Sequence, residues 1–239
     1  MRQRIRAFFL TSGLAIGLVA GAHANPVPTM SLEVFEGMPG SLVSVAGPTP
    51  PTSSGSLQFT SATIPNFSLV QASVAGFPIV PQADLSAGSI QMTTAGFTGT
   101  RELKILITQD NLDTIGNPIN FQTSTAANFI AGANQILGVT LSAYLDTTNV
   151  DFGQGTLIQS DMYTSAGTSG TINHALPFVN GPFSETFVID ALFSGNEAAT
   201  LFPSIILNTT SIPEPGTLTL LGTALVGLNM IRRRRQTVA

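Results

Sequence analysis

The chain has 239 residues, of which 43% are apolar, 9% are charged and none is cysteine, so we expect a packed core without disulfide bonds, a thiol nucleophile or thiolate-bound zinc. Between residues 25 and 212, two basic residues, Arg101 and Lys104, stand against twelve acidic ones, a net charge of −10. Such a surface repels phosphate groups, which argues against binding to nucleic acid or to anionic lipid surfaces.

The first 24 residues have the three parts of a secretory signal peptide. A basic start is followed by an apolar run from residue 7 to residue 22. Ala22 and Ala24 then form a small-x-small cleavage site before Asn25. This order predicts export by the secretion machinery and removal of residues 1–24 by signal peptidase.

Residues 25–211 contain many short stretches in which apolar and polar residues alternate. Alternation with a period of two is typical of strands with one buried and one exposed face. The predicted strands are 31–35, 41–46, 56–60, 66–74, 85–93, 102–108, 118–124, 137–145, 156–163, 186–191 and 200–208. The clearest is 137–145, in which five apolar residues alternate with small or polar ones.

Segments rich in Gly, Pro, Asn and Asp separate these strands, and no amphipathic helices lie between them. About ten to twelve strands at this spacing predict an all-β fold, a single antiparallel β-sandwich of jelly-roll-like type over residues 25–211. The only helical candidate is a short piece at 126–131.

Residues suited to catalysis are scarce in this region. His174 is the only histidine after residue 24, and no GxSxG motif or comparable nucleophile motif accompanies it. One imidazole without thiolates cannot form an ordinary zinc site. We therefore predict no catalytic residues, and interpret His174 as a solvated residue of a loop or strand end.

Two acidic loops are the candidates for calcium. One contains Asp146, Asn149 and Asp151, and the other contains the set Asp110, Asn111 and Asp113. Carboxylate and amide oxygens suit calcium, but neither loop has EF-hand spacing, and turns select the same residues for local hydrogen bonds. We favour turn chemistry, with no metal and no other cofactor, and keep calcium as the alternative.

Sugar binding usually relies on exposed Trp or Tyr rings, yet this chain has no Trp and only Tyr144 and Tyr163. Tyr144 is predicted on the polar face of its strand, where an ordinary cross-strand contact is the simpler interpretation. Phe59 and Phe187 are predicted to lie in the core. A carbohydrate-binding module therefore remains the alternative function, and a secreted hydrolase with paired carboxylates is less favoured.

The C-terminal 28 residues form a third segment. Pro213, Glu214 and Pro215 precede an apolar run of fifteen residues, 217–231, which ends at Arg232, Arg233, Arg234 and Arg235. A helix of that length spans roughly 22 Å, short of the ~30 Å of a bilayer core. The arginines favour the cytoplasmic side, so we predict a marginal transmembrane helix with its C-terminus inside.

This arrangement resembles the PEP-CTERM sorting signal of exopolysaccharide-producing Gram-negative bacteria. The resemblance covers residues 212–239 and implies that an exosortase, a membrane-embedded protease-transpeptidase, acts at Pro213-Glu214-Pro215. It also implies transient anchoring in the inner membrane, followed by release to the cell surface or to a matrix of exopolysaccharide or biofilm. We therefore expect an exported, non-enzymatic surface protein.

Overall fold

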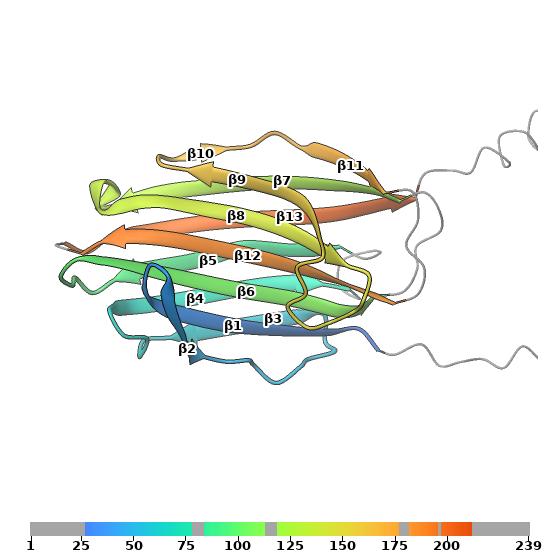
Figure 1. Ribbon diagram of the computed structural model, residues 1–239, viewed down its shortest axis with the longest axis horizontal. Coiled ribbons are helices and arrows are strands. Elements are labelled where there is room, and N and C mark those ends of the chain that lie inside the picture. Colours follow the sequence, from blue (N-terminus) through green and yellow to red (C-terminus); the bar gives the residue numbers. More distant parts are fainter. Residues whose placement is uncertain (1–26, 78–83, 113–118, 177–181, 196, 212–239) are drawn as a thin grey trace, which may run out of the picture.

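The computed structural model describes residues 27–77, 84–112, 119–176, 182–195 and 197–211, which form two antiparallel sheets packed face to face (Figure 1). Sheet A, in front in this view, has the strand order β2 (Ser41–Ala46), β1 (Thr29–Met38), β6 (Thr100–Leu112), β12 (Phe183–Ser194), β8 (Ile136–Asp146) and β9 (Thr156–Tyr163).

Sheet B lies behind it (Figure 1). Its strand order is β10 (Gly167–Thr168), β7 (Ile119–Ala131), β13 (Thr200–Ser211), β5 (Leu85–Thr94), β4 (Phe67–Gly76) and β3 (Ser56–Ser61), and β11 (Ile172–Leu176) also pairs with β7. A single 3₁₀ turn, η1 (Ala133–Gln135), connects β7 to β8 across the two sheets.

One hydrophobic core fills the space between the sheets, and both contribute to it. The alternation seen in the sequence explains this, because successive side chains of a strand point to opposite faces. On β12, for example, Phe187, Ile189 and Ala191 are buried inward, while Asp190 between them is partly exposed. Phe121 of β7 contributes from sheet B.

The structure confirms the predicted all-β antiparallel sandwich, and each of the eleven predicted stretches overlaps a strand. Two short strands, β10 and β11, were not predicted. The helical prediction for 126–131 is wrong. That piece belongs to β7, where it pairs with β13, and this pairing outweighs the weak helical preference of its three alanines.

The prediction for 137–145 is wrong in one position, because Leu137 is 43% exposed. The pairing between β8 and β12 is shifted there: Gly138 pairs with Leu192, and Ile136 with Phe193. Leu137 is the extra residue of this irregularity, so the side chain of Ile136 takes the inward position instead.

Both ends of the described chain lie at the same end of the sandwich, where β1 begins and β13 ends (Figure 1). No helix within the described ranges is sufficiently long and apolar for a membrane span. The predicted signal peptide at 1–24 and the predicted transmembrane segment at 217–231 lie outside those ranges.

Candidate functional sites

The fold brings the two predicted acidic loops together at the end of β6 and β8. Asn111 and Asn149 bond to each other twice: the Asn111 backbone N–H donates to Asn149 Oδ1 (2.7 Å), and Asn149 Nδ2 donates to Asn111 Oδ1 (2.8 Å). Both residues have positive φ angles, a conformation that Asn tolerates better than most residues. Asn111, like Asp110, belongs to β6 rather than to the predicted loop, so the Asn149 side chain joins the turn after β8 to the end of that strand.

Asp146 also acts locally. Its Oδ1 accepts hydrogen bonds from the backbone N–H of Thr148 (2.8 Å) and from Thr148 Oγ1 (2.6 Å). This is the pattern by which Asp stabilises a turn two residues ahead, and it supports the interpretation that these loops are built from turn chemistry.

Asp151 lies beside Asp110, whose Oδ1 accepts a hydrogen bond from the Thr29 backbone N–H (3.1 Å). Burial raises the pKa of the Asp151 carboxyl, and its hydrogen bond and charge repulsion with Asp110 raise it further. No group of three His, Cys, Asp or Glu side chains positioned to hold a metal ion occurs in the described part of the chain. Asp113 lies outside that part.

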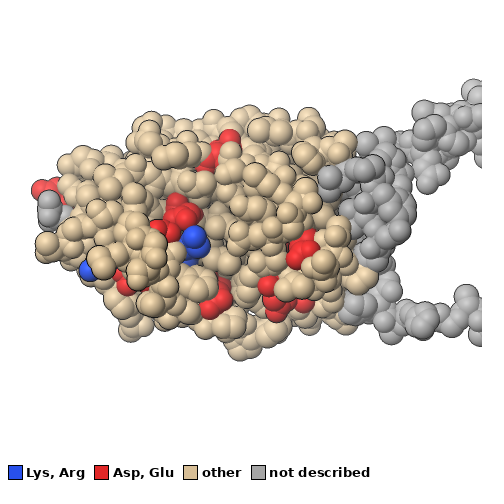
Figure 2. Space-filling view, in the orientation of Figure 1, with Lys and Arg blue, Asp and Glu red and all other residues tan. Residues whose placement is uncertain are grey.

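The two cations of the described chain are both engaged on sheet A, whose outer face carries many Asp and Glu side chains (Figure 2). Lys104 Nζ lies 3.2 Å from Asp190 Oδ2 and 3.7 Å from Glu102 Oε1. Arg101 Nε lies 3.6 Å from Glu36 Oε1. Both cations therefore already have acidic partners, and neither is free to bind an anionic ligand.

His174 and the two tyrosines lie in structural positions. His174 is half-buried in β11, an outer strand that pairs with β7, rather than in a loop. Tyr144 is half-buried and pairs across the sheet with Thr186. The Tyr163 hydroxyl lies 2.6 Å from Thr125 Oγ1 and donates to the Thr125 carbonyl oxygen (3.1 Å), which ties β9 to β7 across the two sheets.

Two buried carboxyl groups, Glu185 and Asp84, were not singled out from the sequence. Glu185 of β12 is fully buried, and both its carboxylate oxygens lack a hydrogen-bond partner among the described residues. Burial, reinforced by the charge of Asp84, raises the pKa of Glu185 well above its ordinary value. Glu185 lies two positions before Phe187 on the inward face, so extending the alternation of 186–191 backwards would have found it.

Asp84 precedes β5 in sheet B. Burial raises its pKa, although hydrogen bonds from Thr209 oppose the shift. The Thr209 backbone N–H donates to Asp84 Oδ1 at 2.5 Å. These two carboxyl groups are both buried in the sandwich.

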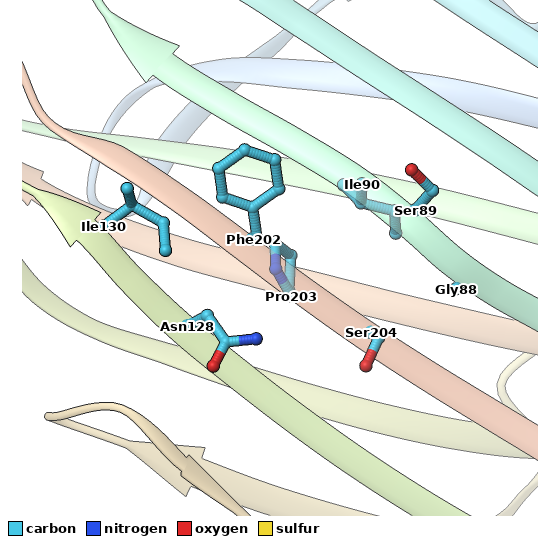
Figure 3. Close-up of a pocket in the computed structure, with 8 residues that line it drawn as sticks. All are labelled: Gly88, Ser89, Ile90, Asn128, Ile130, Phe202, Pro203 and Ser204. Atoms are coloured by element: carbon cyan, nitrogen blue, oxygen red, sulfur yellow. The ribbon is translucent and has the colours of Figure 1, made fainter.

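The outer face of sheet B contains a groove of about 330 Å³ (Figure 3). Phe202 and Pro203 of β13 lie in its middle, with Asn128 and Ile130 of β7 on one side and Ser89 of β5 on the other. The remaining lining residues are Gly88, Ile90 and Ser204.

The groove arises where the pairing of β13 with β5 is interrupted. Leu201 pairs with Met92 and Ile205 with Ala87, so three residues of β13 face four of β5. Pro203 has no N–H to donate to the ladder, which is why proline is rare in a strand with neighbours on both sides. Gly88 and Ser89 are both exposed, as expected where a strand bulges. Pro203 within the predicted strand 200–208 was the signal that could have located this site.

Comparison with protein families finds one match, to the PEP-CTERM protein-sorting motif, over residues 211–235. This confirms the resemblance seen in the C-terminal sequence. The motif begins at the last residue of β13, so Pro213 follows the end of the sandwich by two residues. Its residues Pro213, Glu214, Pro215 and Arg232–Arg235, like Ala22, Ala24 and Asn25 of the signal-peptide cleavage site, lie outside the described ranges.

Comparison with curated proteins gives no significant match. Among solved structures, one similar chain is TmCBM61 in complex with β-1,4-galactotriose, at 11% identity, covering 57% of this chain and 87% of that one with a TM-score of 0.28. Another is the structure of infectious bursal disease virus, Gx strain, at 13% identity, 83% and 54% coverage and a TM-score of 0.31.

A third structure concerns the promiscuous specificity of carbohydrate-binding modules from the β-sandwich superfamily, at 10% identity, 73% and 83% coverage and a TM-score of 0.23. Likenesses this distant say nothing about what the present chain binds.

Proposed function

Because residues 211–235 carry a PEP-CTERM protein-sorting motif, we propose that the chain is an exported, non-enzymatic protein of a Gram-negative cell surface or extracellular matrix. The motif implies an exosortase as its processing partner. After signal peptidase removes residues 1–24, the apolar segment 217–231 holds the protein in the inner membrane until the exosortase acts at Pro213-Glu214-Pro215.

The position of the motif supports this order of events. Ser211 is the last residue of β13, and β13 pairs with β7 along its whole length. Cleavage at Pro213-Glu214-Pro215 therefore removes none of the described strands. Proline at both flanks of Glu214 disfavours helical backbone, so we expect a protease to reach this segment.

The chemistry of the sandwich supports a binding or structural role better than a catalytic one. Its one described histidine, His174, is half-buried in a paired strand. The loops around Asp146 and Asn149 are occupied with turn hydrogen bonds, which favours a protein that works without calcium. We propose association with exopolysaccharide or biofilm as the setting of this role.

Replacing Glu214 with alanine in the native host tests the proposal. We expect the variant to accumulate in the membrane fraction with residues 213–239 attached, whereas the wild type loses them, as measured by intact mass. Glu197→Ala, which removes an exposed acid outside the motif, is the matched control and should be processed normally. Wild-type protein recovered with its tail intact and permanently embedded would contradict the proposal.

A further inference from the structure

The seven strands of sheet B contain no Asp, Glu, Lys or Arg. Their outward side chains are mostly neutral hydrogen-bonding groups, such as Gln71, Gln91, Thr93, Ser124 and Asn208. The groove around Phe202 is a place on the described face where apolar side chains lie beside such groups. Ile130 at its rim is 65% exposed.

We propose that this groove binds an uncharged polysaccharide. The half-buried ring of Phe202 and the exposed side chain of Ile130 offer an apolar surface for the C–H face of a sugar ring. Asn128 pairs directly across from Phe202 in the β7–β13 register, and its carboxamide points toward β13 near Pro203 (Figure 3). Ser89 of β5 and Ser204 of β13 supply hydroxyl groups.

Charge identifies the class of polysaccharide. No lining residue is charged, and both described cations are paired with acids on sheet A. Residues 25–212 carry a net charge of −10, so an acidic polymer such as alginate would be repelled without any compensating contact. A neutral chain with many hydroxyl groups meets no such barrier.

The groove is less suited to an apolar protein partner. Asn128, Ser89 and Ser204 would lose water against an apolar surface without gaining hydrogen bonds, which opposes binding. A sugar supplies both a C–H face and hydroxyl groups that can donate and accept. The volume of about 330 Å³ is at the lower end for small-molecule sites, which fits a short part of a longer polymer.

Affinity electrophoresis of the full chain tests this inference, with the protein kept in a zwitterionic detergent that has no sugar head group. Native gels contain dextran, mixed-linkage β-glucan or galactomannan as neutral polymers, and alginate as the acidic one. We expect slower migration in at least one neutral gel and unchanged migration in alginate. No retardation in any neutral gel, or equal retardation in alginate, would overturn the inference.

Three variants locate the site. Asn128→Ala should raise the dissociation constant about three- to tenfold through its lost hydrogen bonds, and Phe202→Ala by about tenfold or more. Asn128 is exposed, so its substitution remains informative even if Phe202→Ala fails to fold. Gln58→Ala, an exposed amide on the distant strand β3, is the matched control and should bind like the wild type.

Equal binding by all three variants would show that the groove is not the site. Sedimentation velocity supplies a further check. If the wild type forms dimers and Ile130→Ser does not, a second copy of the chain covers this face. That outcome would also overturn the inference. The inference relies on the proposed function only for bringing the protein outside the cell. Failure to bind sugar leaves the Glu214→Ala result unaffected, and failure of sorting leaves the binding unaffected.

Discussion

The two sheets share one core but differ sharply on their outer faces. Every charged residue of the described strands belongs to sheet A, including the Lys104–Asp190 ion pair on its outer face, whereas the described strands of sheet B have none. Inward positions on both sheets are filled by the same kinds of aliphatic and aromatic side chains. The difference shows that burial determines the inner faces, while the outer faces are free to take different chemistry.

The largest expected effect tests whether the two sheets, despite their different outer faces, share one core. Phe187 of sheet A and Phe121 of sheet B are both fully buried in the shared core. Replacing either with alanine should lower the free energy of unfolding by about 3–5 kcal/mol, because each leaves a cavity that its neighbours fill only partly. Urea denaturation monitored by circular dichroism measures both losses.

Similar losses for Phe187→Ala and Phe121→Ala would support one cooperative core. If one substitution left a separate unfolding transition for the other sheet, the two sheets would be independent units and would not share one cooperative core.

A smaller effect is expected at Glu185, the buried acid on the inner face of sheet A. Its carboxyl has no hydrogen-bond partner among the described residues, so Glu185→Gln should raise the free energy of unfolding at neutral pH, on the order of 1–3 kcal/mol. Asp190→Asn, on the outer face of the same strand, is the matched control. It removes one surface ion pair with Lys104, and should change stability by less than about 1 kcal/mol.

The sign of the pH dependence follows from the raised pKa of Glu185. Between the ordinary pKa of glutamic acid and this raised value, the folded protein keeps a proton that the unfolded chain releases. The free energy of unfolding therefore falls as pH rises through that window. Glu185→Gln should flatten this part of the profile. A variant that is less stable than the wild type at neutral pH would show instead that the ionised carboxylate is held by favourable contacts.

The sequence was sufficient to predict the sandwich because most of its strands have one buried and one more exposed face, as at residues 200–208. It failed where pairing with a distant strand decides the outcome. The piece 126–131 is short and contains three alanines, and its pairing with β13 and β10 makes it a strand.

The groove and the loop cluster were beyond sequence reasoning for a related reason. Asn128, Ser89 and Phe202 come from three strands that lie far apart in the chain, and nothing local in the sequence places them together. Asn111 and Asn149 were likewise assigned to two separate loops before the fold showed that they bond to each other.

The smallest expected effect concerns the acidic loop of sheet A. Asp146→Ala removes the acceptor for two hydrogen bonds from Thr148, and should lower the free energy of unfolding by about 1 kcal/mol.

If Asp146 acts through the turn, calcium should leave the melting temperature of the wild type unchanged, and a chelator should also leave it unchanged. A rise in melting temperature with millimolar calcium that is lost in Asp146→Ala would contradict this interpretation and favour a bound cation, because a ligand that binds only the folded state must stabilise it. Asp190→Asn, which removes an acid from the outer face of the same sheet, is the comparison that separates such a specific effect from general screening of the acidic face by salt.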